Sequence, residues 1–443
     1  MDDLWLLVLA FGISLALGGI SILSPDWVFN QEHMRLDIAA KQAQHTRPTP
    51  RVGGAAVVVS LLIVGILATK QLQLDLILAL LPGLLVFVVG LREDIRRDVS
   101  PKVRLIAAFA AGALAVSLTG QTVHGLGLVH LDRIFGWFGL GVIVTLLWSA
   151  GSCHALNLID GLNGLASGYA ICAAAAFWVI GGYTQDTDIQ TIALLLISAL
   201  LGFFVLNWPL GLIFLGDAGA YVIGHVLAWL GILLIARNPE VVGFAVLLVM
   251  FWPVADTIFS IIRRVRLRKA TDQPDRLHFH HLVVRGLALA KPSGKSKVWG
   301  NSLATIVMMP LFIAPILGGV VFWDEPIRAF LVLGLFAGVF IITYRYSIDY
   351  FVGNEFRQRA NTNAPNYYEE VSKLSGIYVQ DGMAVDVHIF RSGPELPWEL
   401  ITYAAGAHDR RWEELFDTDL DAWETFLCSA QQDGMQAIMG RVL

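Results

Sequence analysis

Charged residues are scarce in this chain of 443 residues. They make up 15% of the sequence, whereas 56% of it is hydrophobic, and soluble domains usually carry about 25% charged residues. The deficit excludes an ordinary soluble globular protein. Together with repeated apolar runs of about 16 to 22 residues, it indicates a polytopic membrane protein.

Cysteine is scarce as well. The three cysteines, Cys153, Cys172 and Cys428, are far apart and lack metal-ligand spacing, which argues against a disulfide framework and a cysteine-bound metal. The first apolar run has neither a basic leader nor an A-x-A cleavage site. We therefore expect a retained helix there and not a cleaved signal peptide.

The chain is rich in apolar runs that predict about eleven membrane spans. Their approximate positions are 4–24, 53–69, 76–91, 104–120, 136–151, 164–182, 191–207, 213–236, 241–262, 301–322 and 327–345. Several are short for a hydrocarbon layer of about 30 Å, so tilt, re-entry or interior packing is expected there. The predicted fold class is an all-α polytopic membrane protein with about 11 transmembrane helices.

Lysine and arginine gather in the loops that follow the odd-numbered spans, as at Arg51, Arg92 and Arg263. The alternate loops hold little more than Lys70, Arg133, Arg237 and the flanking Arg328. By the positive-inside rule, the N-terminus lies outside and the odd loops lie in the cytoplasm. An odd number of spans places the C-terminal tail in the cytoplasm too.

The tail from about 346 to 443 is charged and has no apolar run long enough to span a membrane. Met383 to Phe390 alternates like a strand, and Asp409 to Phe426 resembles an amphipathic, acidic helix. We expect a transmembrane domain over 1–345 and a small cytosolic C-terminal appendage over 346–443. The sequence of the appendage does not indicate its role.

Polar, chemically reactive segments interrupt the apolar pattern, and the predicted topology places all of them on the cytoplasmic face. They are Arg47–Gly54, Glu93–Asp98, Asn157–Asn163, Gly216–Gly219 and Asp275–His281. Carboxylates, histidines and arginines at helix ends on one side predict an active site at the membrane surface. Its substrate would have a lipid tail and a phosphate-bearing head.

Two of these segments carry a carboxylate beside glycines or amides. Asp217, between Gly216 and Gly219 at the start of an apolar helix, is a candidate Mg²⁺ ligand, because Mg²⁺ prefers one or two carboxylates plus phosphate oxygens. A helix cap is the alternative. Asn157, Asp160 and Asn163 share a face if helical, which suits a sugar, a nucleotide or metal-bound water. A polar turn is the alternative there.

Glu93 and Asp94 form an adjacent acidic pair among several basic residues. Such a pair can hold a metal or accept a proton from a phosphate, although neighbouring residues do not share a helix face. A solvated charged loop is the alternative.

Basic and histidine-rich segments complete the set. His278, His280 and His281 follow Arg276, and histidine with arginine suits phosphate binding; zinc binding or a structural role are the alternatives. Arg47 begins a stiff, proline-rich turn that could bind lipid phosphate or could simply set the topology.

Together the segments resemble the polyprenyl-phosphate N-acetylhexosamine-1-phosphate transferases of glycosyltransferase family 4. The resemblance runs from about Arg47 to Arg285 and rests on RPTPRVGG, GLREDIRRDVSPKVRL, NLIDGLNGLASG, GDAGAYVIG and DRLHFHHL. The last piece is similar to the bacterial branch that uses simple UDP-N-acetylhexosamines. The branch that uses UDP-N-acetylmuramoyl-pentapeptide usually has three consecutive histidines.

The resemblance implies a reaction in which undecaprenyl phosphate attacks the sugar-bearing phosphate of a UDP-N-acetylhexosamine. The products are a lipid-linked sugar diphosphate and UMP, with Mg²⁺ or alternatively Mn²⁺ as cofactor, and GlcNAc is the default sugar. Such a product starts a cell envelope polysaccharide, for example lipopolysaccharide. The resemblance implies a location in the bacterial inner (plasma) membrane. The expected partners are membrane lipids, and no nucleic acid is expected to bind. A homodimer is compatible with this interpretation.

The resemblance also implies roles for individual residues. Asp217 and Asp94 would bind the metal, and Glu93, Asp94 and Asp160 would be catalytic. The substrate-binding residues would be Arg47, Asn157, Asn163, Arg276, His278, His280 and His281.

Two residues depart from the family pattern. Glu93 stands where the family usually has Asp, and its longer arm shifts the charge by more than about an ångström. This shift puts in doubt a scheme in which the first acid is the sole base. A phosphate monoester has a second pKa of about 6, so the lipid phosphate that attacks is already largely deprotonated and needs no such base. Asn163 stands where many relatives have Asp, which removes one ligand or base.

Two other classes of function compete with the enzyme. A transporter or flippase would place ionisable residues in the middle of the membrane and break paired helices. An inactive relative that acts as a scaffold is suggested by Glu93, Asn163 and the tail. Release of UMP would separate the enzyme from both.

Overall fold

The computed structural model describes residues 4–23, 49–68, 72–128, 132–134, 137–266, 278–290, 297–362, 370–380, 383–391, 397–404, 410–412 and 414–432. The chain divides into two compact units, Met1–Phe351 and Val352–Leu443, and each is described by itself. The division of roles predicted at 345/346 stays a prediction.

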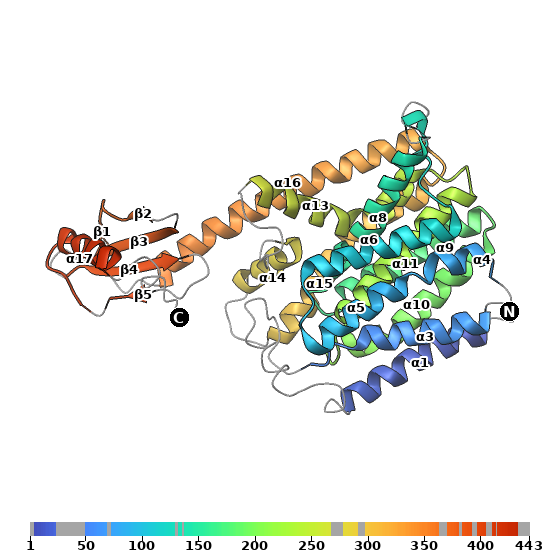
Figure 1. Cartoon of the computed structure of the whole chain (residues 1–443), viewed down its shortest axis with the longest axis horizontal. Helices are drawn as coiled ribbons and strands as arrows, with labels where there is room; N and C mark the ends of the chain where they lie inside the picture. Colours follow the sequence, from blue (N-terminus) through green and yellow to red (C-terminus); the bar gives the residue numbers. More distant parts are fainter. Residues whose placement is uncertain are drawn as a thin grey trace. The chain divides into compact units, whose positions relative to one another are not determined.

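The first unit is a bundle of helices (Figure 1). They are α1 (Leu4–Leu23), α3 (Gly53–Ala68), α4 (Leu74–Leu80), α5 (Gly83–Arg96), α6 (Pro101–Thr119), α8 (Phe138–Ile159), α9 (Leu165–Tyr183), α10 (Thr187–Asn207), α11 (Gly216–Arg237), α12 (Gly243–Val249), α13 (Phe251–Arg266), α14 (Phe279–Ala290), α15 (Lys297–Val321) and the part of α16 (Pro326–Thr362) up to Phe351. Within the described residues, nine stretches are helical, long and apolar enough to cross a membrane. The prediction of an all-α polytopic membrane protein is confirmed.

Two of the predicted spans differ from a straight crossing. The span predicted at 53–69 is α3, whose 16 residues are short for a hydrocarbon layer of about 30 Å. The span predicted at 241–262 is α12 followed by α13, and the two helices are bent by 80° at Met250. The apolar run is continuous there, so hydropathy alone did not reveal the bend.

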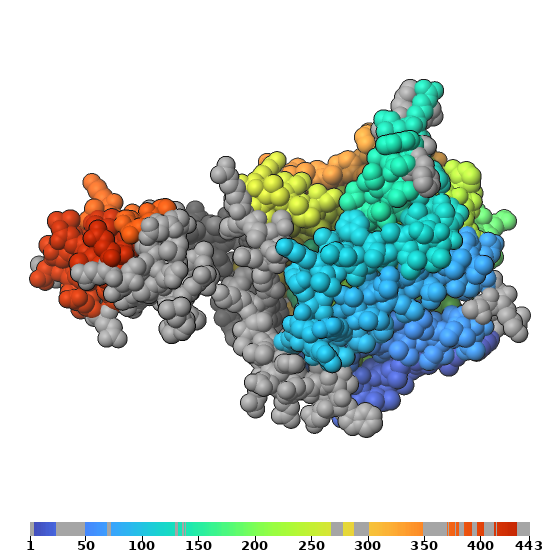
Figure 2. Space-filling model, viewed as in Figure 1, coloured from blue at the N-terminus to red at the C-terminus, as the bar shows by residue number. Residues whose placement is uncertain are grey.

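The centre of the bundle is α11, which packs against α3, α5, α8 and α9. Nearly all of it is buried, whereas side chains of α3, α5, α6 and α8 form most of the face seen in Figure 2. Glycines bring α11 close to its neighbours. A Cβ on Gly54 would lie 2.2 Å from the Gly219 Cα atom, and one on Gly224 would lie 2.7 Å from the Cys153 Cα atom. Larger residues would force these helices apart.

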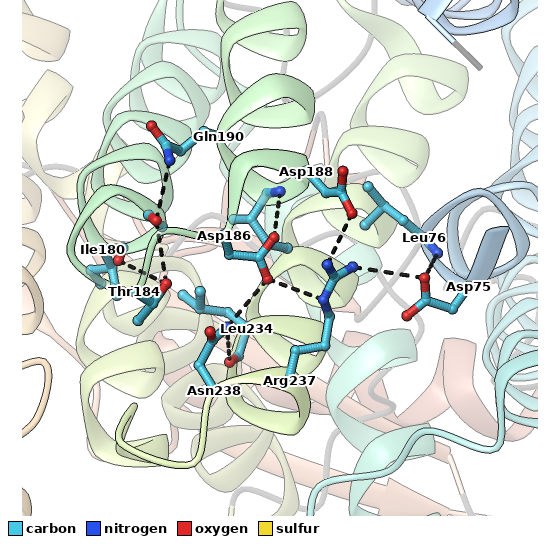
Figure 3. A network of polar contacts seen from close by, with 12 residues as sticks. Asp75, Leu76, Ile180, Thr184, Asp186, Asp188, Gln190, Leu234, Arg237 and Asn238 are labelled. Carbon is cyan, nitrogen blue, oxygen red and sulfur yellow. Dashed lines mark hydrogen bonds and ion pairs between the residues drawn. The ribbon is translucent and has the colours of Figure 1, made fainter. Parts of the chain in front are cut away.

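The C-terminal end of α11 carries an ion-pair network, the Arg237 cluster, formed by Asp75, Asp186, Asp188, Arg237 and Asn238 (Figure 3). The guanidinium of Arg237 places Nε 3.0 Å from Asp186 Oδ2 and Nη2 2.9 Å from Asp188 Oδ2. Its Nη1 atom lies 3.7 Å from Asp75 Oδ1. Because the three acids stand at the starts of α4 and α10, this cluster ties both helices to the end of α11.

The second unit contains an antiparallel sheet and one helix. The strands are β1 (Glu370–Val371), β2 (Gly376–Gln380), β3 (Met383–Arg391), β4 (Glu399–Ala404) and β5 (Arg410–Arg411), in the order β1-β3-β4-β5, and β2 also pairs with β3. The strand predicted at 383–390 is confirmed. Its inward residues Val385, Val387 and Ile389 pack in one core with Phe426 of the helix α17 (Asp419–Gln432).

The helix predicted from Asp409 to Phe426 was wrong in its first half. Asp409 lies outside the described residues, and Arg410–Arg411 pairs with β4 as β5. Helix α17 begins only at Asp419 and continues to Gln432. Backbone pairing with β4 decided the structure of this short segment, and its own pattern did not.

Candidate active site

The ends of five helices meet around the N-terminus of α11, where α11 begins with Gly216 and Asp217. Gly216 has a φ of 74°, in the region that favours glycine. A Cβ at this position would lie 2.2 Å from the Arg51 carbonyl oxygen and 2.7 Å from an Asp94 carboxylate oxygen. The start of α11 therefore requires glycine, and its free N–H groups favour anions.

Asp94 binds the backbone at this N-terminus. Its carboxylate accepts the N–H of Asp217 at 2.8 Å and the N–H of Ala218 at 2.8 Å, and the residue is buried. These are N–H groups that no carbonyl of the helix can satisfy. Gly90 lies one turn earlier in α5, and a Cβ there would lie 2.7 Å from the Ala218 nitrogen. Asp94 thus fixes α5 to the start of α11.

Asp217 presents its carboxylate to side chains from three other segments. Arg104 of α6 pairs through Nη1 with Oδ2. Asn157 of α8 donates from Nδ2 to Oδ1 at 3.0 Å. Arg51, just before α3, places Nη2 3.8 Å from Oδ1 and Nε 4.0 Å from Asp94 Oδ1. Two arginines and two buried aspartates are therefore interleaved at this point.

Asp160 ends α8 and faces the same group of charges. Burial raises the pKa of its carboxyl well above the ordinary value; nearby Arg51 opposes this rise, whereas the Asp94 and Asp217 carboxylates add to it. The N–H of Gly216 is a hydrogen-bond partner of Asp160. Asp160 is thus a group that can carry a proton beside the start of α11.

Glu93 and Asp94 point in different directions, as expected for adjacent residues of a helix. The Oε2 atom of Glu93 accepts the N–H of Val99 at 2.9 Å. This bond closes the loop after α5, where Arg97 has a φ of 56°. Glu93 therefore supports the loop, whereas Asp94 reaches α11.

The histidine motif lies against the NLIDGLN segment. A Cβ on Gly161 would be 2.7 Å from His280 Nε2, and the His280 and His281 ring centroids are 4.1 Å apart. Burial, reinforced by the neighbouring His281 and His278, lowers the pKa of His280 well below its ordinary value. His280 is therefore neutral at pH 7, and its Nδ1 atom is buried without a hydrogen-bond partner among the described residues.

Asp256 holds the first histidine in place. Its Oδ2 atom is 3.2 Å from His278 Nδ1, and its Oδ1 accepts the N–H of Phe279 at 3.2 Å. Asp256 is buried and comes from α13, while the two groups that it binds begin α14. The bend between α12 and α13 brings this acid to the motif.

Asn163 lies apart from the carboxylates. Its N–H donates to Asn301 Oδ1 at 3.0 Å, its Nδ2 donates to the Pro209 carbonyl at 3.3 Å, and its carbonyl accepts from Thr305 at 2.8 Å. These contacts join the NLIDGLN segment to α15 and to the turn after α10. The contacts of Asn163 therefore hold segments of the fold together.

The structure brings Asp94, Asn157, Asp160 and Asp217 together and places the three histidines beside the same loop. Arg47 and Arg276 lie outside the described residues. Sequence reasoning did not single out Asp256 or Tyr221. An acid within an apolar run is itself a signal that could have found Asp256. Tyr221 lies one turn after Asp217, and its hydroxyl is 3.5 Å from His154 Nδ1.

The oxygen donors of this site suit a divalent cation that is bound jointly by the protein and by the phosphates of a substrate. Within the described ranges, no group of three His, Cys, Asp or Glu side chains converges to hold a metal. Mg²⁺, however, is commonly bound by one or two carboxylates together with water and phosphate oxygens. Asp217 and Asp160 supply such hard oxygen donors, and the Arg104 guanidinium already occupies Asp217 as a cation.

Comparison with known proteins agrees with these residues. The family model for glycosyl transferase family 4 matches residues 76–235, which include Asp94, Asn157, Asp160 and Asp217. This part of the chain is similar to glycosyl transferase family 4. This confirms the resemblance inferred from the motifs.

Curated relatives align over somewhat more than half of the chain. A probable undecaprenyl-phosphate N-acetylglucosaminyl 1-phosphate transferase of Bacillus subtilis is 28% identical over 57% of this chain and 71% of its own length. An undecaprenyl-phosphate alpha-N-acetylglucosaminyl 1-phosphate transferase of Yersinia pestis is 27% identical over 55% and 67%. A decaprenyl-phosphate N-acetylglucosaminephosphotransferase of Mycobacterium leprae is 26% identical over 54% and 68%.

Proposed function

We propose that this protein transfers a sugar 1-phosphate from a UDP-N-acetylhexosamine, with GlcNAc as the first candidate, to undecaprenyl phosphate. An oxygen of the lipid phosphate attacks the sugar-bearing phosphorus, and the bond from that phosphorus to UMP breaks. The observation that carries the proposal is the convergence of Asp217, Asp94 and two arginines on the start of α11. The relatives, named as polyprenyl-phosphate N-acetylglucosaminyl 1-phosphate transferases, support the substrate class.

The residues of the site have distinct tasks in this reaction. Arg51 and Arg104 supply positive charge for the diphosphate, since arginine recognises phosphate through several N–H groups. Asn157 orients Asp217, and Asp94 holds the backbone that carries it. Catalysis of phosphoryl transfer consists mostly of such positioning and charge stabilisation.

Proton transfer is a lesser requirement. A phosphate monoester with a second pKa of about 6 is largely ionised at pH 7, so no residue has to act as the sole base. Asp160 is the acid best placed to carry a proton, because the carboxylate of Asp94 is bound to two backbone N–H groups and that of Glu93 to another. We assign Asp94 and Glu93 to positioning.

Mg²⁺, or Mn²⁺ in its place, is the cofactor that we propose, with Asp217 as its carboxylate ligand and Asp160 nearby. When bound, the ion would neutralise the diphosphate and stabilise the leaving UMP. The histidine motif would bind phosphate through imidazole N–H groups.

The site would face the cytoplasm of a bacterium from the inner membrane. The basic loops at this end of the helices support that orientation by the positive-inside rule. The cytoplasm is also where a UDP-sugar is made, and the lipid phosphate would reach the site from within the membrane.

The test is UMP release by purified protein in detergent, with undecaprenyl phosphate, Mg²⁺ and a panel of UDP-sugars. We expect release that requires both lipid and divalent metal and stops on chelation. The most active UDP-sugar would identify the donor. Well-folded protein that releases no UMP from any donor would contradict the proposal.

A further inference from the structure

Arg104 and Asp217 form a largely enclosed ion pair at the start of α11. The side chain of Arg104 is 18% exposed and that of Asp217 is 7% exposed. The Nη1 atom of Arg104 contacts Asp217 Oδ2, while Asn157 donates to the other carboxylate oxygen at 3.0 Å. Both oxygens of the proposed metal ligand are therefore bound to protein donors.

Arg104 also has unused capacity to bind an anion. Its Nε atom is buried and has no hydrogen-bond partner among the described residues. On the facing helix α8, His154 Nε2 is likewise buried and unpaired within the described part of the chain. Buried donors without partners are costly, and a phosphate oxygen could satisfy the guanidinium Nε of Arg104.

A divalent ion and a guanidinium do not bind favourably to the same carboxylate at the same time. Their positive charges repel at contact distance, and the repulsion is stronger in a partly buried site than in water. A diphosphate changes the balance, because it offers oxygens to both cations. The partner that Arg104 prefers should therefore depend on the presence of the nucleotide.

We propose that the Arg104 guanidinium takes the place of a divalent ion at Asp217 in the free protein. When a divalent ion binds Asp217, Arg104 leaves this carboxylate and moves to the phosphates of the UDP-sugar. This inference rests on the proposed function. It predicts that Arg104 opposes metal binding in the free protein and favours donor binding once the metal is present. A purely structural Arg104 would do neither.

The experiment measures Mn²⁺ binding to full-length protein in detergent by electron paramagnetic resonance, with and without UDP. Four proteins are compared: wild type, Arg104→Gln, Arg104→Lys and Arg92→Gln. Arg92 is the matched control, since its pair with Asp98 is exposed, with side chains 59% and 41% accessible, and lies outside the site. Thermal unfolding and size-exclusion profiles report whether each variant is folded.

Without UDP, Arg104→Gln should bind Mn²⁺ about tenfold more tightly than wild type, which corresponds to about 1.4 kcal/mol. With Mn²⁺ present, the same variant should bind UDP about tenfold more weakly. Arg104→Lys keeps the charge but loses the planar fork, so its Mn²⁺ affinity should stay within about twofold of wild type while UDP binding weakens. Arg92→Gln should match wild type in both.

Equal or weaker Mn²⁺ binding by Arg104→Gln would overturn the proposal, and so would undiminished UDP binding. If the Gln variant does not fold, the Lys variant decides, and tighter Mn²⁺ binding with normal UDP binding would overturn it. UMP release by the wild-type preparation separates this inference from the proposed function. Active protein with equal Mn²⁺ affinities defeats only the exchange, whereas protein that releases no UMP defeats the function itself.

Discussion

The two ends of α11 carry ion-pair clusters of opposite sign. At the start, the carboxylate of Asp217 faces Arg104 and Arg51. At the end, the guanidinium of Arg237 faces three carboxylates (Figure 3). Both arrangements suit the helix dipole, which favours negative charge at the N-terminus and positive charge at the C-terminus.

The difference between the clusters lies in what else binds the carboxylates. Asp186 also accepts the N–H of Ile189 at 3.2 Å, and Asp75 accepts the N–H of Leu76 at 2.9 Å. Asp217, among the described residues, meets only side-chain donors. A carboxylate bound to a backbone N–H is fixed in place, whereas one held by side chains alone can change partners. By this criterion Asp94 belongs with the structural acids.

Arg237→Gln should have the largest effect on stability. It leaves three carboxylates without their cation, and breaking a largely buried ion pair costs about 3 kcal/mol. We expect a lower unfolding temperature in detergent but kcat and KM for UMP release within about twofold of wild type, because distant sites act independently. Arg328→Gln, which removes an exposed pair with Glu325, is the control and should change neither. A large loss of kcat in folded Arg237→Gln would show that the far cluster also serves the reaction.

Asn163→Asp should lower stability by about 1 to 2 kcal/mol. The substitution replaces the Nδ2 donor with a carboxylate oxygen that faces the Pro209 carbonyl. Although the family resemblance implied Asp at this position, we expect no gain in activity. The measurements are thermal unfolding and the rate of UMP release. A variant as stable as wild type and more active would place Asn163 in the chemical site.

Asp160→Asn should change how stability depends on pH. The pKa of Asp160 is raised in the folded protein, so folded protein binds more protons than unfolded protein from about pH 4 upward. This residue therefore lowers stability as pH rises through that window. The unfolding temperature of Asp160→Asn relative to wild type should increase from pH 4 to pH 8. A difference that is constant with pH would mean that Asp160 has an ordinary pKa.

Glu93→Gln should have the smallest effect. The amide keeps an oxygen that can accept the Val99 N–H, so kcat should fall by less than about threefold, or about 0.7 kcal/mol in barrier height. Glu93→Asp shortens the arm and should lose this bond, with a lower unfolding temperature. A large loss of kcat in Glu93→Gln alone would return Glu93 to an ionised catalytic role.

The sequence predicted the helices well because long apolar runs admit few alternatives in a membrane. It did not predict the bend at Met250, since α12 and α13 form one apolar run, nor β5, whose structure depends on pairing with β4. Helix geometry predicted that Glu93 and Asp94 would diverge. It could not predict which of them faces α11, because that depends on how the helices pack.

The candidate site residues were easier to predict from the sequence than the residues that contact them. Glycines, amides and carboxylates at helix ends made Asp217, Asn157 and Asp160 candidates from local pattern, and the structure brings the three together. Asp256 was missed because its role depends on His278 and Phe279, which lie 22 and 23 positions further along the chain. The pairing of Arg104 with Asp217 joins residues 113 positions apart, a distance over which local patterns carry no information.

The most direct test is the rate of UMP release by Asp217→Asn, measured beside wild type with undecaprenyl phosphate, Mg²⁺ and the best UDP-sugar. The amide keeps an oxygen for Arg104 but loses the charge that a metal requires. We predict that kcat falls at least about 100-fold, or about 2.7 kcal/mol, in protein that remains folded. Folded Asp217→Asn that retains more than about a tenth of the wild-type rate would contradict the assignment of the start of α11 as the active site.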